Sequence, residues 1–237
     1  MSTLVITPCF YPDTSKLHYL QKSADVFGIE LYPFGIGDFW RGTVGGDVYA
    51  QYVAAAELLK SLPASYDRIL FTDGCDTFFC AGMDDINRKY EDIGHEILYS
   101  AEPGLYPPHM HDEYNAHKHE HTELTTPWCY PNIGGWIGKR ETVIDFLDYM
   151  RTHFTDVNEG QPRFVHAYLE DGWPIKLDSE CQIFQTMSGG LGDAVEVDAQ
   201  GRIHNMITKS YPCLVHFNGR LGGIEELFAK RFTKEAR

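Results

Sequence analysis

The stretch Arg68-Ile-Leu-Phe-Thr-Asp73-Gly-Cys-Asp76-Thr-Phe-Phe79 decides the fold of this chain. Its apolar start predicts a strand buried on both faces, as in a parallel sheet covered by helices. Asp73 and Asp76 then fall at the carboxyl end of that strand, where open α/β sheets bind ligands. Two carboxylates at this place can hold a hard divalent cation, with oxygens left for a phosphate or a ribose. The alternative is a strand followed by an Asp-Gly turn in which Asp76 caps the next segment.

A strand-helix-strand pattern opens the chain. Residues 4–7 predict a buried strand, residues 17–27 carry apolar side chains at helical spacing before Gly28, and residues 29–34 predict a second strand. This order is the βαβ signature of a nucleotide-binding half-domain. The glycine-rich segment 35–46 can bring backbone amides close to a ligand. Its spacing matches neither the dinucleotide fingerprint nor the P-loop.

The remaining apolar patterns complete an α/β domain without an internal repeat or a linker. Residues 164–169 are ambiguous between helix and strand. The other predicted elements are helices over 48–62 (capped by Asp47), 84–90, 139–154 and 224–232, strands over 96–101, 133–138, 175–177 and 213–218, and a hairpin over 194–205.

Residues 103–131 show no periodicity, which predicts a solvated mobile lid. The segment carries histidines at positions 109, 111, 117, 119 and 121. Such a cluster could bind a transition metal, but the spacing matches no known ligand frame, so the lid is the favoured interpretation.

Composition narrows the functional classes. The chain has 237 residues and a formal net charge of −14, which disfavours nucleic acid and acidic membranes as partners. No apolar run reaches the length of a membrane span and no signal peptide is evident, so we expect a cytoplasmic protein. The six cysteines form no Cys-x-x-Cys pair, and neither a zinc ribbon nor a disulfide framework is indicated.

His216 interrupts the apolar strand predicted over 213–218. A lone histidine there is usually a hydrogen-bonded core residue. The alternative is that His216 joins Asp73 and Asp76 on one metal ion, with Asn218 and Gly219 beside it.

Taken together, these landmarks resemble the amino-terminal glycosyltransferase domain of the collagen lysyl hydroxylases, the multifunctional procollagen-modifying enzymes. The motifs follow the family's order over nearly the whole chain. They are Leu4-Val-Ile-Thr7, Trp40-Arg41-Gly42 with Val44-Gly45-Gly46, Phe71-Thr-Asp73-Gly-Cys-Asp76, Ser100-Ala101-Glu102, Asn132-Ile-Gly-Gly-Trp-Ile-Gly138, Leu177-Asp178 with Ile183-Phe184-Gln185, and His216-Phe-Asn218-Gly219.

The resemblance implies one GT-A domain over residues 1–237, an α/β fold with a Rossmann-like mixed sheet flanked by helices. Residues 1–102 would bind the donor, and residues 103–237 would form the acceptor and lid part. The implied ligands are Mn²⁺, held by Asp73, Asp76 and His216, and a UDP-sugar donor. The candidate donor-binding residues are Thr7, Trp40 (on the uridine), Gly45, Gly46, Asp73, Cys75, Asn218, Gly219 and Arg220.

The same resemblance places Tyr106 on a loop near the sugar, and Tyr106 and Trp136 are the candidate acceptor residues. Asp178 and Asn132 are the candidate catalytic residues. Asp178 would stabilise the sugar ring or orient the acceptor hydroxyl, and its alternative role is to cap the following segment.

Two departures from the family pattern affect the donor site. Tyr49 stands where the family has a lysine that contacts phosphate. Cys75 stands where the family has an aromatic residue between the two aspartates. Arg220 is the candidate replacement for the missing cation.

The expected reaction is transfer of a hexose, from UDP-glucose or UDP-galactose, to a hydroxyl-bearing protein, glycan or small molecule, with retention of configuration. Two other classes stay open. A nucleotidyltransferase or sugar-phosphatase could use the same carboxylates, and a non-catalytic nucleotide-sugar sensor would fit the loss of the lysine at Tyr49.

Overall fold

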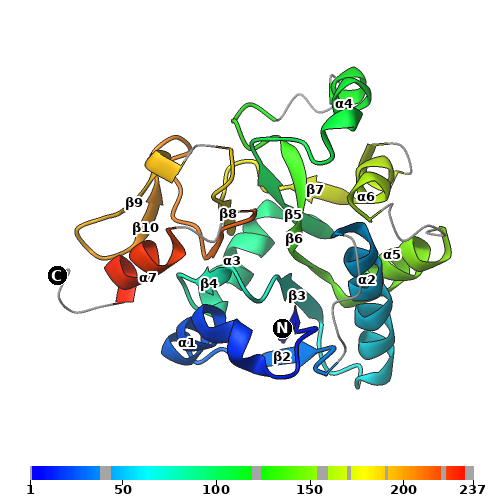
Figure 1. Cartoon of the computed structure of the whole chain (residues 1–237), viewed down its shortest axis with the longest axis horizontal. Coiled ribbons are helices and arrows are strands. Elements are labelled where there is room, and N and C mark those ends of the chain that lie inside the picture. The colour runs from blue at the N-terminus through cyan, green and yellow to red at the C-terminus, as the bar shows by residue number, and fades with distance from the viewer. Residues whose placement is uncertain are drawn as a thin grey trace.

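A six-stranded mixed sheet forms the centre of the protein (Figure 1). The computed structural model describes residues 2–37, 44–118, 124–153, 160–169, 172–189, 192–219 and 223–232. The strand order is β2-β1-β3-β6-β5-β7. These strands are β1 (Thr3–Pro8), β2 (Leu31–Phe34), β3 (Arg68–Thr72), β5 (Ile97–Glu102), β6 (Tyr130–Lys139) and β7 (Ile175–Leu177). The predicted α/β fold with a mixed sheet is confirmed.

The direction of the strands follows from the connections. β1 pairs in parallel with both β2 and β3, as the opening βαβ pattern predicts. β6 runs antiparallel between β3 and β5, and its Trp136 lies opposite Phe71 on one side and Tyr99 on the other. The carboxyl ends of β1, β3 and β5 therefore lie along one edge of the sheet.

Helices cover both faces of this sheet. One face packs against α2 (Val44–Ser61), α5 (Arg140–His153) and α6 (Gly160–Leu169), which lie together on the right of Figure 1. The other face packs against α1 (His18–Phe27) and α3 (Met83–Ile93). A 3₁₀ turn, η1 (Thr14–Leu17), precedes α1, and Gly28 closes that helix with φ of 65°.

A second sheet has three strands in the order β4-β11-β8. They are β4 (Thr77–Phe79), β8 (Phe184–Thr186) and β11 (Leu214–His216). β4 follows β3 after four residues, so a single short loop joins the two sheets. The predicted hairpin is present as β9 (Val195–Val197) and β10 (Ile203–Asn205), preceded by η3 (Gly192–Ala194), and α7 (Ile224–Phe232) lies beside it in Figure 1.

Two sequence predictions need correction and one open alternative is resolved. Residues 103–131 contain regular structure, η2 (Pro108–Met110) and α4 (His111–Lys118), because Met110 and Tyr114 are buried in the core and anchor the segment. α2 is already helical at Val44, so Asp47 lies inside the helix rather than capping it. The ambiguous residues 164–169 belong to α6.

Within the described ranges, no helix is both long and apolar enough to cross a membrane.

Candidate metal centre

Asp73 and Asp76 lie on the loop that joins the two sheets. Thr77 closes this loop, because its hydroxyl donates a hydrogen bond to the carbonyl oxygen of Asp73. The amide of Asp73 donates to the carbonyl of Gly134 on β6, 2.8 Å away. Both ends of the loop are thereby fixed to strands, so the two carboxylates project from a rigid support.

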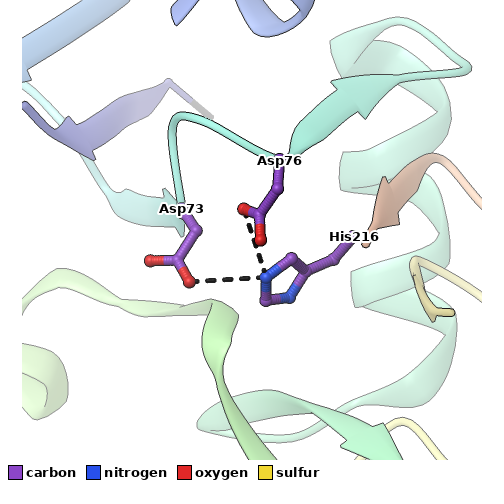
Figure 2. Close-up of side chains that lie close together, drawn as sticks. All are labelled: Asp73, Asp76 and His216. Carbon is purple, nitrogen blue, oxygen red and sulfur yellow. Dashed lines mark ion pairs between the residues drawn. The ribbon is translucent and has the colours of Figure 1, made fainter. Parts of the chain in front are cut away.

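His216 reaches these carboxylates from the second sheet. It is the last residue of β11 and pairs with Thr77, the first residue of β4. Its Nε2 lies 3.4 Å from Oδ2 of Asp73 and 3.4 Å from Oδ1 of Asp76 (Figure 2). Three side chains from two sheets, 143 positions apart at the extremes, thus converge on one point.

The three side chains fit a divalent cation. Their ligand atoms all lie within 4.8 Å of one another. Ligands about 2.1 Å from a common ion lie roughly 3.0–3.4 Å apart in octahedral or tetrahedral geometry, which agrees with the two 3.4 Å separations. In the part of the chain that the structure describes, no other cluster of His, Cys, Asp and Glu meets this condition.

The electrostatics of the cluster also favour a cation. Burial raises the pKa of Asp73 to about 7, although the imidazolium of His216 opposes the shift. Burial by itself lowers the pKa of His216, but the carboxylates of Asp76 and Asp73 outweigh it and raise that pKa to about 9. Two partly buried carboxylates this close favour positive charge between them, which a divalent ion supplies.

Glu102 is a further buried acid at this site, and the sequence predictions gave it no role. It ends β5 and is only 7% exposed. Asn218 donates from Nδ2 to Oε2 of Glu102 over 2.6 Å, the hydroxyl of Ser188 donates to the same oxygen over 3.3 Å, and the side chain of Asn132 lies beside the carboxyl. Burial raises the pKa of Glu102 to about 7, against the effect of these hydrogen bonds and of His216. The signal in the sequence was the same as for Asp73, an acid that directly ends an apolar strand.

Two predicted catalytic or donor residues, Asn132 and Asn218, therefore meet at Glu102. Oδ1 of Asn132 also accepts hydrogen bonds from the amide of Gly134 at 3.1 Å and the hydroxyl of Ser100 at 3.0 Å. Asn218 accepts a hydrogen bond at Oδ1 from the amide of Ser188. Gly219, next to Asn218, has φ of 69°, a conformation that favours glycine.

Thr7 and Cys75 lie on the β1 side of the same centre. Oγ1 of Thr7 is buried without a hydrogen-bond partner among the described residues. A Cβ at Gly74 would stand 2.9 Å from this oxygen, so Thr7 contacts the loop that carries the two aspartates. Cys75 is partly buried between Asp73 and Asp76.

Asp178 has the capping geometry that the sequence offered as an alternative. It follows β7 and is 3% exposed. Its Oδ2 accepts hydrogen bonds from the amides of Ile183 at 2.7 Å and Phe184 at 2.8 Å, and its Oδ1 accepts one from the amide of Gln182. These three hydrogen bonds fix the segment that leads from β7 into β8.

Trp136 lies in the core and not at a surface that an acceptor could reach. It is 1% exposed, and its ring stacks on Phe71 with centroids 5.1 Å apart. The expectation that Trp136 contacts an acceptor is corrected by this placement, because residue 136 points to the α2 face of the sheet.

Tyr106 is accessible, with 51% of its surface exposed. It follows β5 by four residues, so it stands near the same strand end as Glu102. Two histidines of the predicted cluster are described with their side chains. His111 forms hydrogen bonds with Asn115 and Tyr130, and His109 is exposed. His119 and His121 lie outside the described residues, and the side chain of His117 is also not described.

Four further predicted donor residues lie outside the described residues or in the first turn of α2. Trp40 and Arg220 lie outside the described residues. Gly45 and Gly46 form part of the first turn of α2. The contacts predicted for these residues stay predictions.

A cavity of about 800 Å³ opens at the opposite end of β3, away from the metal centre. Its cations have partners: Lys139 pairs with Glu96, and Arg140 donates to the carbonyls of Leu59 and Leu62. Because these cations already have partners, the cavity is a weaker candidate for a ligand site than the Asp73 cluster.

The central mixed sheet flanked by helices, with the Asp-Asp-His cluster at its carboxyl edge, has the GT-A fold of glycosyltransferases. The family model for the PLOD GT domain matches residues 3–227, and the chain belongs to that family.

The similar proteins agree with this assignment. Human "Multifunctional procollagen lysine hydroxylase and glycosyltransferase LH3" is 28% identical over 231 residues, covering 91% of this chain and 29% of the human protein. The "Procollagen-lysine,2-oxoglutarate 5-dioxygenase" of Drosophila melanogaster is 28% identical over 229 residues, covering 91% of this chain and 30% of the fly protein. The chain thus spans less than a third of the length of these relatives.

Two solved structures share the fold at low sequence identity. A glycosyltransferase involved in the glycosylation of the major capsid of PBCV-1 has a TM-score of 0.56, 9% identity and 98% coverage of both chains. Mouse xyloside xylosyltransferase 1 in its apo form has a TM-score of 0.51 and 11% identity, covering 92% of this chain and 98% of that chain.

Proposed function

We propose that this chain transfers a hexose, glucose or galactose, from a UDP-sugar to a hydroxyl acceptor, with Mn²⁺ bound and with retention of configuration. The observation that carries the proposal is the convergence of Asp73, Asp76 and His216 at the junction of the two sheets. Membership of the PLOD GT domain family supports transfer of a glycosyl group as the reaction.

Asp73, Asp76 and His216 would hold the metal ion. A bound divalent cation supplies the positive charge that neutralises a departing diphosphate. A neutral imidazole in the ligand set suits Mn²⁺ better than Mg²⁺. Because all three side chains are held by strands, the chain fixes the position of the charge before a substrate arrives.

The donor would lie along the carboxyl ends of β1 and β3. Thr7 offers a buried hydroxyl without a partner among the described residues, at the place where a phosphate or ribose oxygen would approach. Trp40, Gly45, Gly46 and Arg220 complete the proposed donor site, with Trp40 on the uridine and Arg220 in place of the lysine missing at Tyr49.

Glu102 and the two asparagines would face the sugar and the acceptor. The acid is buried beside His216, and its oxygens are directed by Asn132 and Asn218. A carboxylate at this place can orient the acceptor hydroxyl and take its proton. Tyr106 stands at the same strand end, and the segment 103–131 would exclude water, which competes with the acceptor for the activated sugar.

The decisive experiment is incubation with Mn²⁺, candidate acceptors and a panel of nucleotide-sugars, with the small products identified chromatographically. Release of UDP with a glycosylated acceptor is the expected result. Pyrophosphate or inorganic phosphate as the product would assign a nucleotidyltransferase or phosphatase instead. Tight donor binding without turnover across all acceptors would assign a sensor.

Two variants make the experiment specific to the site. Asp73→Asn should abolish the activity, since it removes a metal-binding charge. Asp67→Asn is the matched control, because Asp67 lies at the opposite end of β3 and accepts a hydrogen bond from the amide of Ser2. The anomeric configuration of the product, read by NMR, tests retention.

A further inference from the structure

The carboxyl ends of β1 and β3 lie at a topological switch point of the sheet. The helix that leaves β1, α1, packs Leu20 and Ala24 on the face of the sheet that carries Val5 and Leu70. The helix that precedes β3, α2, packs on the opposite face. Adjacent parallel strands whose helices lie on opposite faces leave a crevice between their carboxyl ends, and open α/β sheets bind ligands there.

Tyr11 and Cys75 lie on the two loops that leave these strand ends. Tyr11 follows the last residue of β1 by three positions, and Cys75 follows the last residue of β3 by three. Burial, the larger effect, and the neighbouring side chain of Cys75 raise the pKa of the Tyr11 hydroxyl to about 12. Because Cys75 lies between Asp73 and Asp76, the Tyr11 ring stands directly beside the candidate metal centre.

The backbone around Tyr11 is held in place. The amide of Gly37 donates to the carbonyl of Tyr11 over 2.8 Å, and the amide of Cys9 donates to the carbonyl of Phe34 over 2.8 Å. Phe10 turns inward and packs edge-on against Phe34, with ring centroids 6.2 Å apart. These contacts bind the loop after β1 to the loop after β2.

The side chain of Tyr11, by contrast, stays partly exposed and belongs to none of the hydrophobic clusters formed by the described residues. An aromatic ring on a fixed backbone, left beside a ligand crevice, has the properties of a stacking platform.

We propose that the ring of Tyr11 forms one wall of the nucleoside subsite and packs against the base or ribose of a nucleoside diphosphate whose phosphates reach the Asp73–Asp76 metal centre. The inference rests on the proposed function, since it assumes a nucleotide donor.

Isothermal calorimetry with two probes, UDP and pyrophosphate, each with Mn²⁺, tests the proposal. Tyr11→Ala should weaken UDP binding about 5- to 150-fold, the effect of losing one aromatic stacking partner. The same variant should bind Mn²⁺–pyrophosphate as the wild type does, because that probe has no nucleoside. Tyr11→Phe keeps the ring and should bind UDP within about threefold of the wild type.

Tyr11→Leu serves as a second variant, since it keeps an apolar side chain of moderate size but removes the aromatic face. Its UDP binding should weaken as in Tyr11→Ala. Unchanged UDP affinity in both variants, or an equal loss of UDP and pyrophosphate, would overturn the proposal. A wild-type protein that binds Mn²⁺ but not UDP would instead overturn the proposed function, so the two failures are distinguishable.

Discussion

Gly134 lies directly against His216: a Cβ built at position 134 would stand 2.8 Å from Nδ1 of His216 and closer still to its Cε1. The same Cβ would stand 2.6 Å from Oδ2 of Asp73. β6 thus passes the metal ligands at a distance that only glycine allows. The carbonyl oxygen of Gly134 also accepts a hydrogen bond from the amide of Asp73. Gly134 is therefore part of what shapes the metal centre.

Gly134→Ala should weaken Mn²⁺ binding at least about tenfold, because His216 and Asp73 must both move to admit a methyl group. Gly134 does not have a positive φ, so backbone strain does not contribute to the effect. Electron paramagnetic resonance of free Mn²⁺ during a titration measures the affinity. Gly82→Ala is the control, since a Cβ there meets nothing within 4 Å, and equal Mn²⁺ affinities in the two variants would contradict this account.

Glu102→Gln should leave donor binding nearly unchanged and lower transfer at least about tenfold, the lower part of the range for a positioned acid or base. Glutamine can still accept the hydrogen bond from Asn218, so the fold should be retained. Steady-state kinetics should show the loss in kcat and not in the KM for the donor. The control is Glu96→Gln, which removes a carboxylate at the other end of β5. A Glu102→Gln enzyme with normal kcat would mean that the acid only supports the fold.

Asp178→Asn should lower the stability of the protein by about 2–3 kcal/mol, because an amide cannot accept all the hydrogen bonds that the carboxylate takes from residues 182–184. The melting temperature measures the effect, and a fall of roughly 5–10 °C is expected for a domain of this size. A variant that melts normally but has lost transfer would show that Asp178 is catalytic, as the sequence suggested.

Tyr106→Ala should leave stability and donor binding unchanged but raise the ratio of donor hydrolysis to transfer, because the exposed ring stands where it can shield the sugar from water. Counting released UDP against glycosylated acceptor gives this ratio. Tyr32→Ala is the matched control, since Tyr32 has 40% of its surface exposed but lies on the edge strand β2. Equal ratios in both variants would remove Tyr106 from the proposed lid.

The sequence allowed the position of the metal-binding residues to be predicted because each one interrupts or ends a strongly apolar run. Asp73 and Asp76 follow β3, and His216 ends β11, so periodicity alone located them at strand ends. Their convergence depended on β4 pairing with β11, a contact between residues about 140 positions apart. No local pattern encodes that pairing. From the sequence, a metal ion shared with Asp73 and Asp76 was therefore only one of two alternatives for His216.

Other features depended on tertiary contacts that local reasoning cannot see. α4 has little periodicity of its own, and it is held by burial of Met110 and Tyr114. Trp136 was a candidate acceptor residue, yet its indole stacks in the core, and of the neighbouring glycines it is Gly134 that makes room for the metal ligands. Tyr11 and Cys75 lie 64 positions apart, so their contact appears only once β1 and β3 are paired.

The most direct test of the account is the Mn²⁺ dependence of UDP binding, measured by calorimetry for the wild type and for Asp76→Asn, which keeps the shape of the side chain and removes its charge. The wild type should bind UDP with Mn²⁺ present and lose that binding when the metal is chelated, and Asp76→Asn should bind UDP weakly under both conditions. Wild-type binding of UDP that is equally strong without a divalent ion, or an Asp76→Asn variant with unchanged Mn²⁺-dependent affinity, would contradict the assignment of Asp73, Asp76 and His216 as the metal centre.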